Sequence, residues 1–384
     1  MIRKTLRRKL SVPAVAAGVL VALTGPAGAA GGGEGARGPA RIQALMRADL
    51  EKAADRLGGL ARIQEGRRSW SAAVGVADPA SGRPRRADER FRIGSVTKTF
   101  VATVLLQLQG EGRIDLDDTV ERWLPGLVRG NGNDGSAITV RQLLNHTSGL
   151  FRYDRDPGIA ARLFTSAFLT HRYDTHRPGE LVRAALAHPP AFAPGTGRQY
   201  SNTNYILAGM IIEEVTGRSY GAEIERRLIR PLKLTSTFLP GTRTGIPGPH
   251  ARAHSRFFAA DPGVPLHDVT ELNPSSGGAA GEMISSLRDL TRFHTALMRG
   301  RLLPRAELDE MLTRTPEELG PAGGLGLSPS VLPCEVTVWG HDGGIHGWSS
   351  LILATEDGGR AAAFNYNADS TGSFGRLAAA AFCD

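Results

Sequence analysis

The chain has 384 residues, of which 41% are hydrophobic and 22% charged, so it can bury one sizeable core or two lobes and is neither disordered nor repetitive. Its formal net charge of +8 arises from 46 basic and 38 acidic residues, but five of the basic residues lie within the first nine positions, and without those five the excess is only +3. This small excess, with no run of Lys or Arg in the remaining chain, argues against a nucleic-acid partner.

The first 29 residues have the pattern of a signal peptide. The basic stretch MIRKTLRRKL precedes a short apolar stretch, SVPAVAAGVLVALTG, and the small residues Ala27-Gly28-Ala29. We therefore expect cleavage near Ala29 and a secreted protein, and Arg7-Arg8 leaves a twin-arginine route open beside the general one. The alternative, a membrane anchor, needs about 20 apolar residues, more than this stretch offers. Residues 30–41, rich in glycine, read as a flexible linker.

Strand patterns gather at the two ends of the remaining chain. A helix is expected over 40–57, after which Trp70 to Val76 alternate as a half-buried strand does. Strands return only between Val336 and Tyr366, and a last helix is expected over 374–382. The middle, about 110–320, consists mostly of helical patterns joined by loops rich in proline and glycine.

This order predicts an α/β (α+β) fold in which an antiparallel sheet, formed from both chain ends, is flanked by helices and carries a helical insert. We expect one catalytic domain over 42–384. Its α/β lobe would take up about 42–95 and 325–384, and its helical lobe about 96–324. The cleft between the lobes is the expected site.

Two cysteines are present, Cys334 and Cys383. In an exported chain we expect them to form a disulfide that ties the last helix to a strand, and two buried free thiols are the alternative. No spacing of cysteines or histidines indicates a metal site, and we expect neither a metal nor a cofactor.

The stretch FRIGSVTKTF, residues 91–100, contains one of only five lysines among the 46 basic residues. Ser95 lies in the first turn of a helix expected over 95–109, and Lys98 lies one turn later on the same face. The helix N-terminus favours an oxyanion there, and a desolvated lysine can accept a proton. Arginine cannot, because its pKa lies above about 12. Proton acceptance from Ser95 therefore explains why position 98 carries a lysine and not an arginine.

Two further stretches carry residues of the same chemistry. In RQYSNTNY, Tyr200 and Asn202 stand just before a helical run, although a surface or core tyrosine is the plainer interpretation of Tyr200 alone. In VWGHDGGIHGWSS, His341 follows an alternating strand, and the glycines beside it allow another backbone to lie close. Taken alone, a histidine on a strand is more often structural than catalytic.

Together, S-x-x-K, Tyr-x-Asn and His-x-Gly resemble the serine β-lactamase and penicillin-binding protein superfamily, and specifically its class C β-lactamase and secreted D-alanyl-D-alanine carboxypeptidase branch. The stretches LLNHTSGL and FAPGTGRQYSNTNYILAG are similar to that branch as well. The likeness covers about residues 42–384.

The resemblance implies a role for each matching residue. Ser95 would be the acylated nucleophile, Lys98 its base, and Tyr200 a second proton carrier whose phenolate Lys98 stabilises. Asn202 would orient the substrate amide and hold Lys98, and His341 would hydrogen-bond toward Tyr200.

The backbone around the nucleophile would complete the site. The oxyanion hole would consist of the backbone N–H groups of Ser95 and Gly344, and Gly343 and Asp342 would contact the substrate.

One position departs from the family pattern. Where the third motif often has threonine, whose hydroxyl meets a substrate carboxylate, this chain has Asp342. If its carboxylate faces the site, a substrate with an ester, amide or free amino group is favoured over one with a carboxylate. Alternation along the strand could instead turn it away.

Three functions follow. The first is a D-alanyl-D-alanine carboxypeptidase acting on peptidoglycan stem peptides, with β-lactams as acylating ligands. The second is an esterase, β-lactamase or D-aminopeptidase of the same fold. The third is a non-catalytic protein that binds cell-wall peptide or β-lactam. The sequence does not decide between hydrolysis and transfer to an amine.

Overall fold

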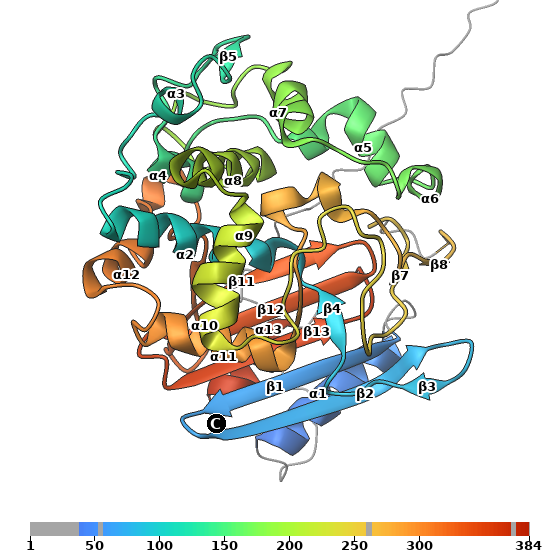
Figure 1. Cartoon of the computed structure of the whole chain (residues 1–384). Coiled ribbons are helices and arrows are strands. Elements are labelled where there is room, and N and C mark those ends of the chain that lie inside the picture. The colour runs from blue at the N-terminus through green and yellow to red at the C-terminus, as the bar shows by residue number, and fades with distance from the viewer. Residues whose placement is uncertain (1–37, 53–56, 259–262, 370–373, 384) are drawn as a thin grey trace, which may run out of the picture.

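The computed structural model describes residues 38–52, 57–258, 263–369 and 374–383 (Figure 1). The expected signal peptide and most of the expected linker lie outside the described residues. A seven-stranded antiparallel sheet forms the centre, in the order β10-β11-β12-β13-β1-β2-β3. Its strands are β1 (Gly58–Glu65), β2 (Arg68–Asp78), β3 (Arg83–Pro84), β10 (Ser328–Val331), β11 (Thr337–Ile345), β12 (Trp348–Thr355) and β13 (Arg360–Tyr366).

The sheet joins the two ends of the chain, as predicted. The first strand, β1, pairs with the last, β13, so that Ala61 lies opposite Phe364, and Figure 1 shows the blue and red strands side by side. Short two-stranded pairs complete the strand set: β4 (Arg90–Arg92) with β9 (Ile284–Ser286), β5 (Arg129–Gly130) with β6 (Asn133–Asp134), and β7 (His254–Ser255) with β8 (His267–Asp268).

Helices cover both faces of the sheet. One face carries α1 (Pro39–Lys52) and α13 (Phe374–Phe382), and the other carries α11 (Leu287–Met298) together with the helical insert (Figure 1). The insert contains α2 (Thr97–Gly110), α3 (Val120–Trp123), α4 (Val140–Leu144), α5 (Pro157–Leu163), α6 (Phe168–His171), α7 (Pro178–Leu186), α8 (Asn202–Thr216), α9 (Tyr220–Ile224), α10 (Arg230–Leu232) and α12 (Arg305–Met311). Six single turns complete it: η1 (Gly94–Val96), η2 (Tyr153–Arg155), η3 (Glu225–Ile229), η4 (Pro274–Ser276), η5 (Gly278–Ala280) and η6 (Glu317–Leu319).

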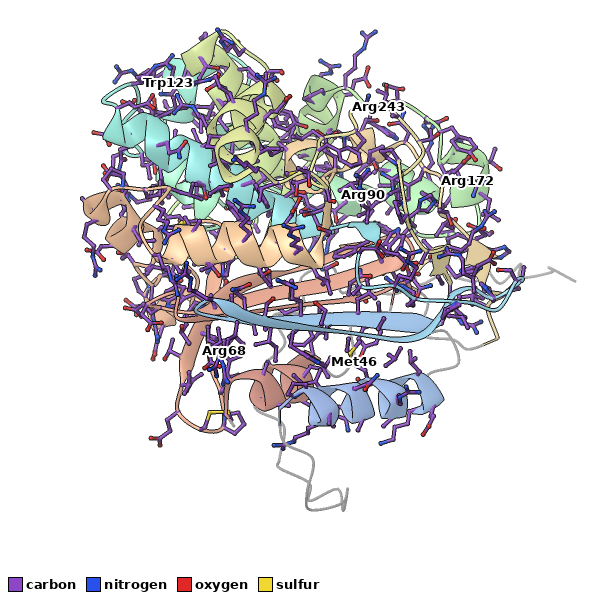
Figure 2. All side chains as sticks on the ribbon, turned by 60° about the horizontal axis from the view of Figure 1, so that its bottom comes forward. Met46, Arg68, Arg90, Trp123, Arg172 and Arg243 are labelled. Atoms are coloured by element: carbon purple, nitrogen blue, oxygen red, sulfur yellow. A yellow bond between two sulfur atoms is a disulfide. The ribbon has the colours of Figure 1, made fainter. Side chains whose placement is uncertain are left out.

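The strand β1 is missing from the elements that the sequence predicts. The helix expected to run to residue 57 is described only to Lys52, and β1 begins at Gly58. The glycines there make the strand hard to recognise, yet the packing requires them. A Cβ on Gly59 would lie 2.6 Å from the Cε of Met46, a fully buried residue of α1 that packs onto the sheet (Figure 2). The missing side chain therefore lets α1 approach the sheet.

The predicted disulfide is present. Cys334, in the turn between β10 and β11, is bonded to Cys383, directly after α13, with the two Cα atoms 5.6 Å apart. It ties the last helix to the outer strands of the sheet. In the described part of the chain, no helix has the length and apolar character that a membrane crossing requires.

Candidate active site

Ser95 and Lys98 lie together where the chain passes from the sheet into the helical insert. Ser95 lies in η1, and α2 follows directly, which places Lys98 one turn further on. The Lys98 Nζ lies 3.0 Å from the Ser95 Oγ. Its second partner is the carbonyl of Ala280, at 2.6 Å, at the end of η5. The lysine is fully buried, so its amine is held between a hydroxyl and a carbonyl and excluded from water.

Tyr200 reaches the same serine from a distant part of the chain. Its hydroxyl lies 2.8 Å from the Ser95 Oγ, across 105 positions of sequence. The Lys98 Nζ lies 4.9 Å from the centre of the Tyr200 ring. The structure thus brings together the three residues that the sequence predicted as nucleophile, base and proton carrier.

The glycines of β11 let its backbone pass directly over the nucleophile turn. Pairing with β10 ends at Gly340, and in the described part of the chain no further strand pairs with that outer edge. A Cβ on Gly343 would lie 2.0 Å from the carbonyl oxygen of Ile93, and one on Gly94 would lie 2.7 Å from that of Gly344. Gly344 is exposed at this edge. Its backbone is therefore close to Ser95 and open to a substrate.

His341 lies beside Tyr200 without bonding to it. The two rings are 6.2 Å apart and inclined by 56°, and the Nδ1 of His341 is 2.5 Å from the carbonyl oxygen of Asp342. Because a carbonyl oxygen only accepts, Nδ1 carries the proton, and Nε2 is the acceptor nitrogen of the neutral ring. The expected hydrogen bond between His341 and Tyr200 is not found among the described residues, whose contact there is between the two rings. Burial lowers the pKa of His341 to about 3, so the ring is neutral at pH 7.

Asp342 lines the same pocket as Tyr200 and His341. Its side chain keeps 30% of its exposure, and its Oδ1 lies 3.8 Å from the Nδ1 of His341. Burial raises the pKa of Asp342 to about 6, and the charge of Lys98 opposes that rise. Asp342 pairs with Leu351, whereas His341 pairs with Ile352, so alternation along β11 places the Asp342 side chain on the opposite face of the strand from His341. From this edge its charge still reaches Lys98 and Tyr200.

Asn202 opens α8 next to Tyr200. Its Oδ1 is buried and has no hydrogen-bond partner within the described residues. The expected hydrogen bond with Lys98 is not found among the described residues, where the partners of the Lys98 amine are the Ser95 hydroxyl and the Ala280 carbonyl. The amide oxygen of Asn202 therefore has an unused acceptor position within the described residues.

Sequence reasoning gave no role to two other residues of the pocket, His146 and Arg198. His146 is 4% exposed, its ring centre lies 4.4 Å from that of Tyr200, and its Nδ1 accepts a bond from the backbone N–H of Ser201. Arg198 lines the pocket, and its Nε donates to the carbonyl of Asn145. The stretch LLNHTSGL, which contains His146, is similar to the same family branch and indicates the position of this residue.

Burial sets the protonation of the central groups. It lowers the pKa of Lys98 well below its usual value, and it raises the pKa of Tyr200. The lowered pKa leaves more of the amine uncharged at a given pH and so able to take the proton of the Ser95 hydroxyl, whereas the raised pKa of the phenol favours its protonated form. The arrangement does not favour the expected Tyr200 phenolate at rest. Its chemistry suits an acyl transfer started by the amine.

In the stretches that the structure describes, no group of three or more His, Cys, Asp or Glu side chains is arranged to hold a metal ion.

The chain is similar to proteins of known structure along most of its length. One is a D-stereospecific amidohydrolase from Streptomyces sp., with 52% identity and a TM-score of 0.83, covering 90% of this chain and 98% of that one. Two curated relatives are Esterase EstB of Burkholderia gladioli and Penicillin-binding protein 4* of Bacillus subtilis (strain 168). EstB is 40% identical over 164 residues, which are 42% of this chain and 41% of EstB. Penicillin-binding protein 4* is 26% identical over 294 residues, which are 73% of this chain and 61% of that protein.

The chain thus matches less than two thirds of the length of either curated relative. The family model described as Beta-lactamase, in contrast, matches residues 42–382, nearly all of the described chain. With its large antiparallel sheet flanked by helices and its serine, lysine and tyrosine in contact, the chain belongs to the Beta-lactamase family and is a serine hydrolase of the β-lactamase and penicillin-binding protein fold.

Proposed function

We propose that this protein is a secreted serine amidohydrolase that cleaves amides and esters of D-configured amino acids through an acyl-enzyme on Ser95. The observation that carries the proposal is the Asp342 carboxylate, which lines the pocket beside Tyr200 and His341. The similarity to the D-stereospecific amidohydrolase, over 98% of its length, supports the stereochemistry. The signal-like first 29 residues support export.

Acylation would begin when the Ser95 Oγ attacks the substrate carbonyl carbon and gives its proton to the Lys98 amine. The resulting oxyanion would receive hydrogen bonds from the backbone N–H groups of Ser95 and Gly344. When the C–N or C–O bond breaks, Tyr200 would protonate the leaving group and recover a proton from the Lys98 ammonium. Asn202 would accept a hydrogen bond from the substrate's own N–H.

Deacylation would reverse these transfers. Water attacks the acyl carbon and gives a proton to the amine–phenol pair, and the Ser95 Oγ leaves with a proton from that pair. The acid product is released and the three groups return to their resting protonation. No oxidant, metal or co-substrate other than water enters the balance.

The charge of Asp342 favours substrates without a carboxylate next to the scissile bond. Two like charges 4 Å apart repel by about 1 kcal/mol in water and about 4 kcal/mol at the effective dielectric constant near a protein surface. Such an energy changes the relative rates of two substrates by about five- to several-hundred-fold. An amide or ester leaving group carries no such charge. A dipeptide that ends in D-alanine does.

A D-alanyl-D-alanine carboxypeptidase acting on peptidoglycan stem peptides is the second candidate, and Arg198 favours it. This guanidinium lines the same pocket and has no carboxylate partner among the described residues. It could receive the terminal carboxylate of such a peptide. The two candidate functions therefore differ in which residue determines the preferred leaving group: Arg198 would attract a terminal carboxylate, and Asp342 would repel it.

Direct comparison of three substrates tests the proposal. We expect D-alanine amide to be hydrolysed faster than L-alanine amide, and faster than a peptide ending in D-Ala-D-Ala, with all turnover lost in Ser95→Ala. Asp342→Asn should raise the rate on the peptide more than the rate on the amide. Faster turnover of the peptide by the native protein would select the carboxypeptidase instead.

Mass spectrometry after incubation with benzylpenicillin supplies an independent check. A penicilloyl group on Ser95 would identify the acylated residue. An adduct that forms once and never decays, in a protein that turns over none of the three substrates, would favour the non-catalytic binding function.

A further inference from the structure

A buried ion pair lies next to the three central side chains, outside the motifs that define the family resemblance. Arg152 and Asp154 are each 4% exposed and follow the LLNHTSGL stretch, with Asp154 inside η2. The contact has two points: the Nη2 of Arg152 lies 2.5 Å from the Oδ2 of Asp154, and its Nε lies 3.2 Å from the Oδ1. The two charges are thus held in a fixed geometry.

Stability alone gives little reason for this pair. Removing two charges from water costs several kcal/mol each, and replacement of a buried ion pair by apolar side chains is often neutral or stabilising. The location of the pair supplies another reason. The Cζ of Arg152 lies 5.7 Å from the centre of the Tyr200 ring, and the Nζ of Lys98 lies 4.9 Å from the same centre. Two basic groups, the Lys98 amine and the Arg152 guanidinium, therefore lie close to the Tyr200 phenol, and Asp154 forms an ion pair with the guanidinium.

The two charges act in opposite directions on both proton-carrying groups. Asp154 raises the pKa of Lys98, and Arg152 lowers it. For Tyr200, Arg152 lowers the pKa and Asp154 raises it. Other titratable groups also face this cluster: His341 and Asp342 from β11, His146 from the loop after α4, Arg198 from the loop before α8, Tyr205 from α8 and Tyr153 from η2.

We propose that Arg152 and Asp154 are positioning residues for acylation: Arg152 holds the Tyr200 ring in place, and Asp154 cancels the charge of Arg152, so that the proton equilibrium among Ser95, Lys98 and Tyr200 is not displaced. The inference rests on the proposed acyl-enzyme chemistry at Ser95, but not on the identity of the substrate.

Single and double variants test this pairing. Asp154→Asn leaves a buried cation beside Lys98 and disfavours its ammonium form, so the acid limb of the acylation rate should move to lower pH. Arg152→Met leaves a buried anion, so the same limb should move to higher pH. Each shift should be about one pH unit, since a close charge changes a pKa by one unit or more. The double variant should return the limb toward its native position.

A fluorophosphonate probe provides the readout. The Ser95 Oγ displaces fluoride from phosphorus and gives up its proton to Lys98, so labelling needs the activated serine but not the true substrate. The labelling rate is measured by intact mass between pH 5 and 9, on variants whose folding is verified by circular dichroism. Arg155→Met, which removes an exposed arginine from the same turn, is the matched control and should leave the limb unmoved.

The outcomes separate cleanly. Opposite shifts in the single variants, with recovery in the double variant, support the inference. If the native limb lies below pH 5, Arg152→Met should bring it into the measured range. Equal losses at every pH, with the limb unmoved, would reduce the pair to a structural role and overturn the proposal. Absence of labelling in the native protein would instead refute the acyl-enzyme chemistry itself.

Discussion

Replacing Lys98 by arginine tests the central chemical argument, because the substitution keeps the positive charge available and removes the ability to accept a proton. The native amine is fully buried, 3.0 Å from the Ser95 Oγ and 2.6 Å from the Ala280 carbonyl oxygen. Burial lowers its pKa well below the usual value, which increases the fraction of uncharged, basic amine at a given pH. A guanidinium, with a pKa above about 12, stays protonated in the same place.

The expected loss follows from the base alone. A positioned general base contributes about 10²- to 10⁴-fold to a rate, which corresponds to about 3 to 5 kcal/mol of the barrier. We therefore expect Lys98→Arg to slow acylation of Ser95 by at least about 10²-fold at pH 7, with no recovery up to pH 9. Buried between two close partners, the larger side chain should also lower the melting temperature.

Burst-phase kinetics with a p-nitrophenyl ester separate acylation from the later steps. Thermal unfolding of the same samples shows how much protein is folded, and Lys52→Arg, on the exposed end of α1, is the matched control. An acylation rate in Lys98→Arg within tenfold of the native rate would refute the assignment of this lysine as the base, and with it the reason for a lysine at this position.

Three further results are expected. Gly343→Ala should abolish acylation, because its Cβ would lie 2.0 Å from the Ile93 carbonyl oxygen and push β11 away from the nucleophile turn. Gly344→Ala, whose Cβ meets only a ring atom at 3.9 Å, should keep most of the activity. Equal losses in the two variants would contradict the close approach of β11 to the nucleophile turn at Gly343. Asp342 has a pKa of about 6, so its carboxyl gains a proton as the pH falls through that value. The preference for amide over carboxylate-bearing substrates should therefore weaken below pH 6 in the native protein and be independent of pH in Asp342→Asn. Parallel pH profiles of this preference in the two proteins would count against a role of Asp342 in substrate selection. Cys383→Ser opens a loop of 49 residues, and chain entropy predicts about 4 kcal/mol less stability in denaturant unfolding; an unchanged midpoint would show that the bridge stabilises nothing.

Much of the fold could be predicted from patterns that belong to single segments. The alternation of Trp70 to Val76 and of the strands after Val336 identified sheet elements at both chain ends, and their antiparallel union follows. The strand β1 could not be predicted, because Gly58 and Gly59 have low strand propensity and are required there by the close approach of β2 and α1. The need for a glycine at such a position exists only once the neighbouring elements are in place.

The site divides in the same way. Ser95 and Lys98 lie one helical turn apart, so their contact is visible in the sequence. Tyr200 came from resemblance, because nothing local brings a residue 105 positions away to the same oxygen. The carbonyl of Ala280, which holds Lys98, is a backbone atom that any residue could supply. Hydrogen bonds to backbone carbonyls cannot be predicted from the residue type at the accepting position.

The pairing of β1 with β13 has a consequence for the order in which the molecule can assemble. The middle of the sheet cannot close until residue 366 has been synthesised, some 300 positions after β1. A nascent chain therefore holds an early hairpin with one unpaired edge while the insert is still being made, and long-range pairing of this kind is slow. We expect truncation before β13 to yield insoluble protein rather than a smaller active one, and a chaperone that shields β1 to raise the yield of the whole chain.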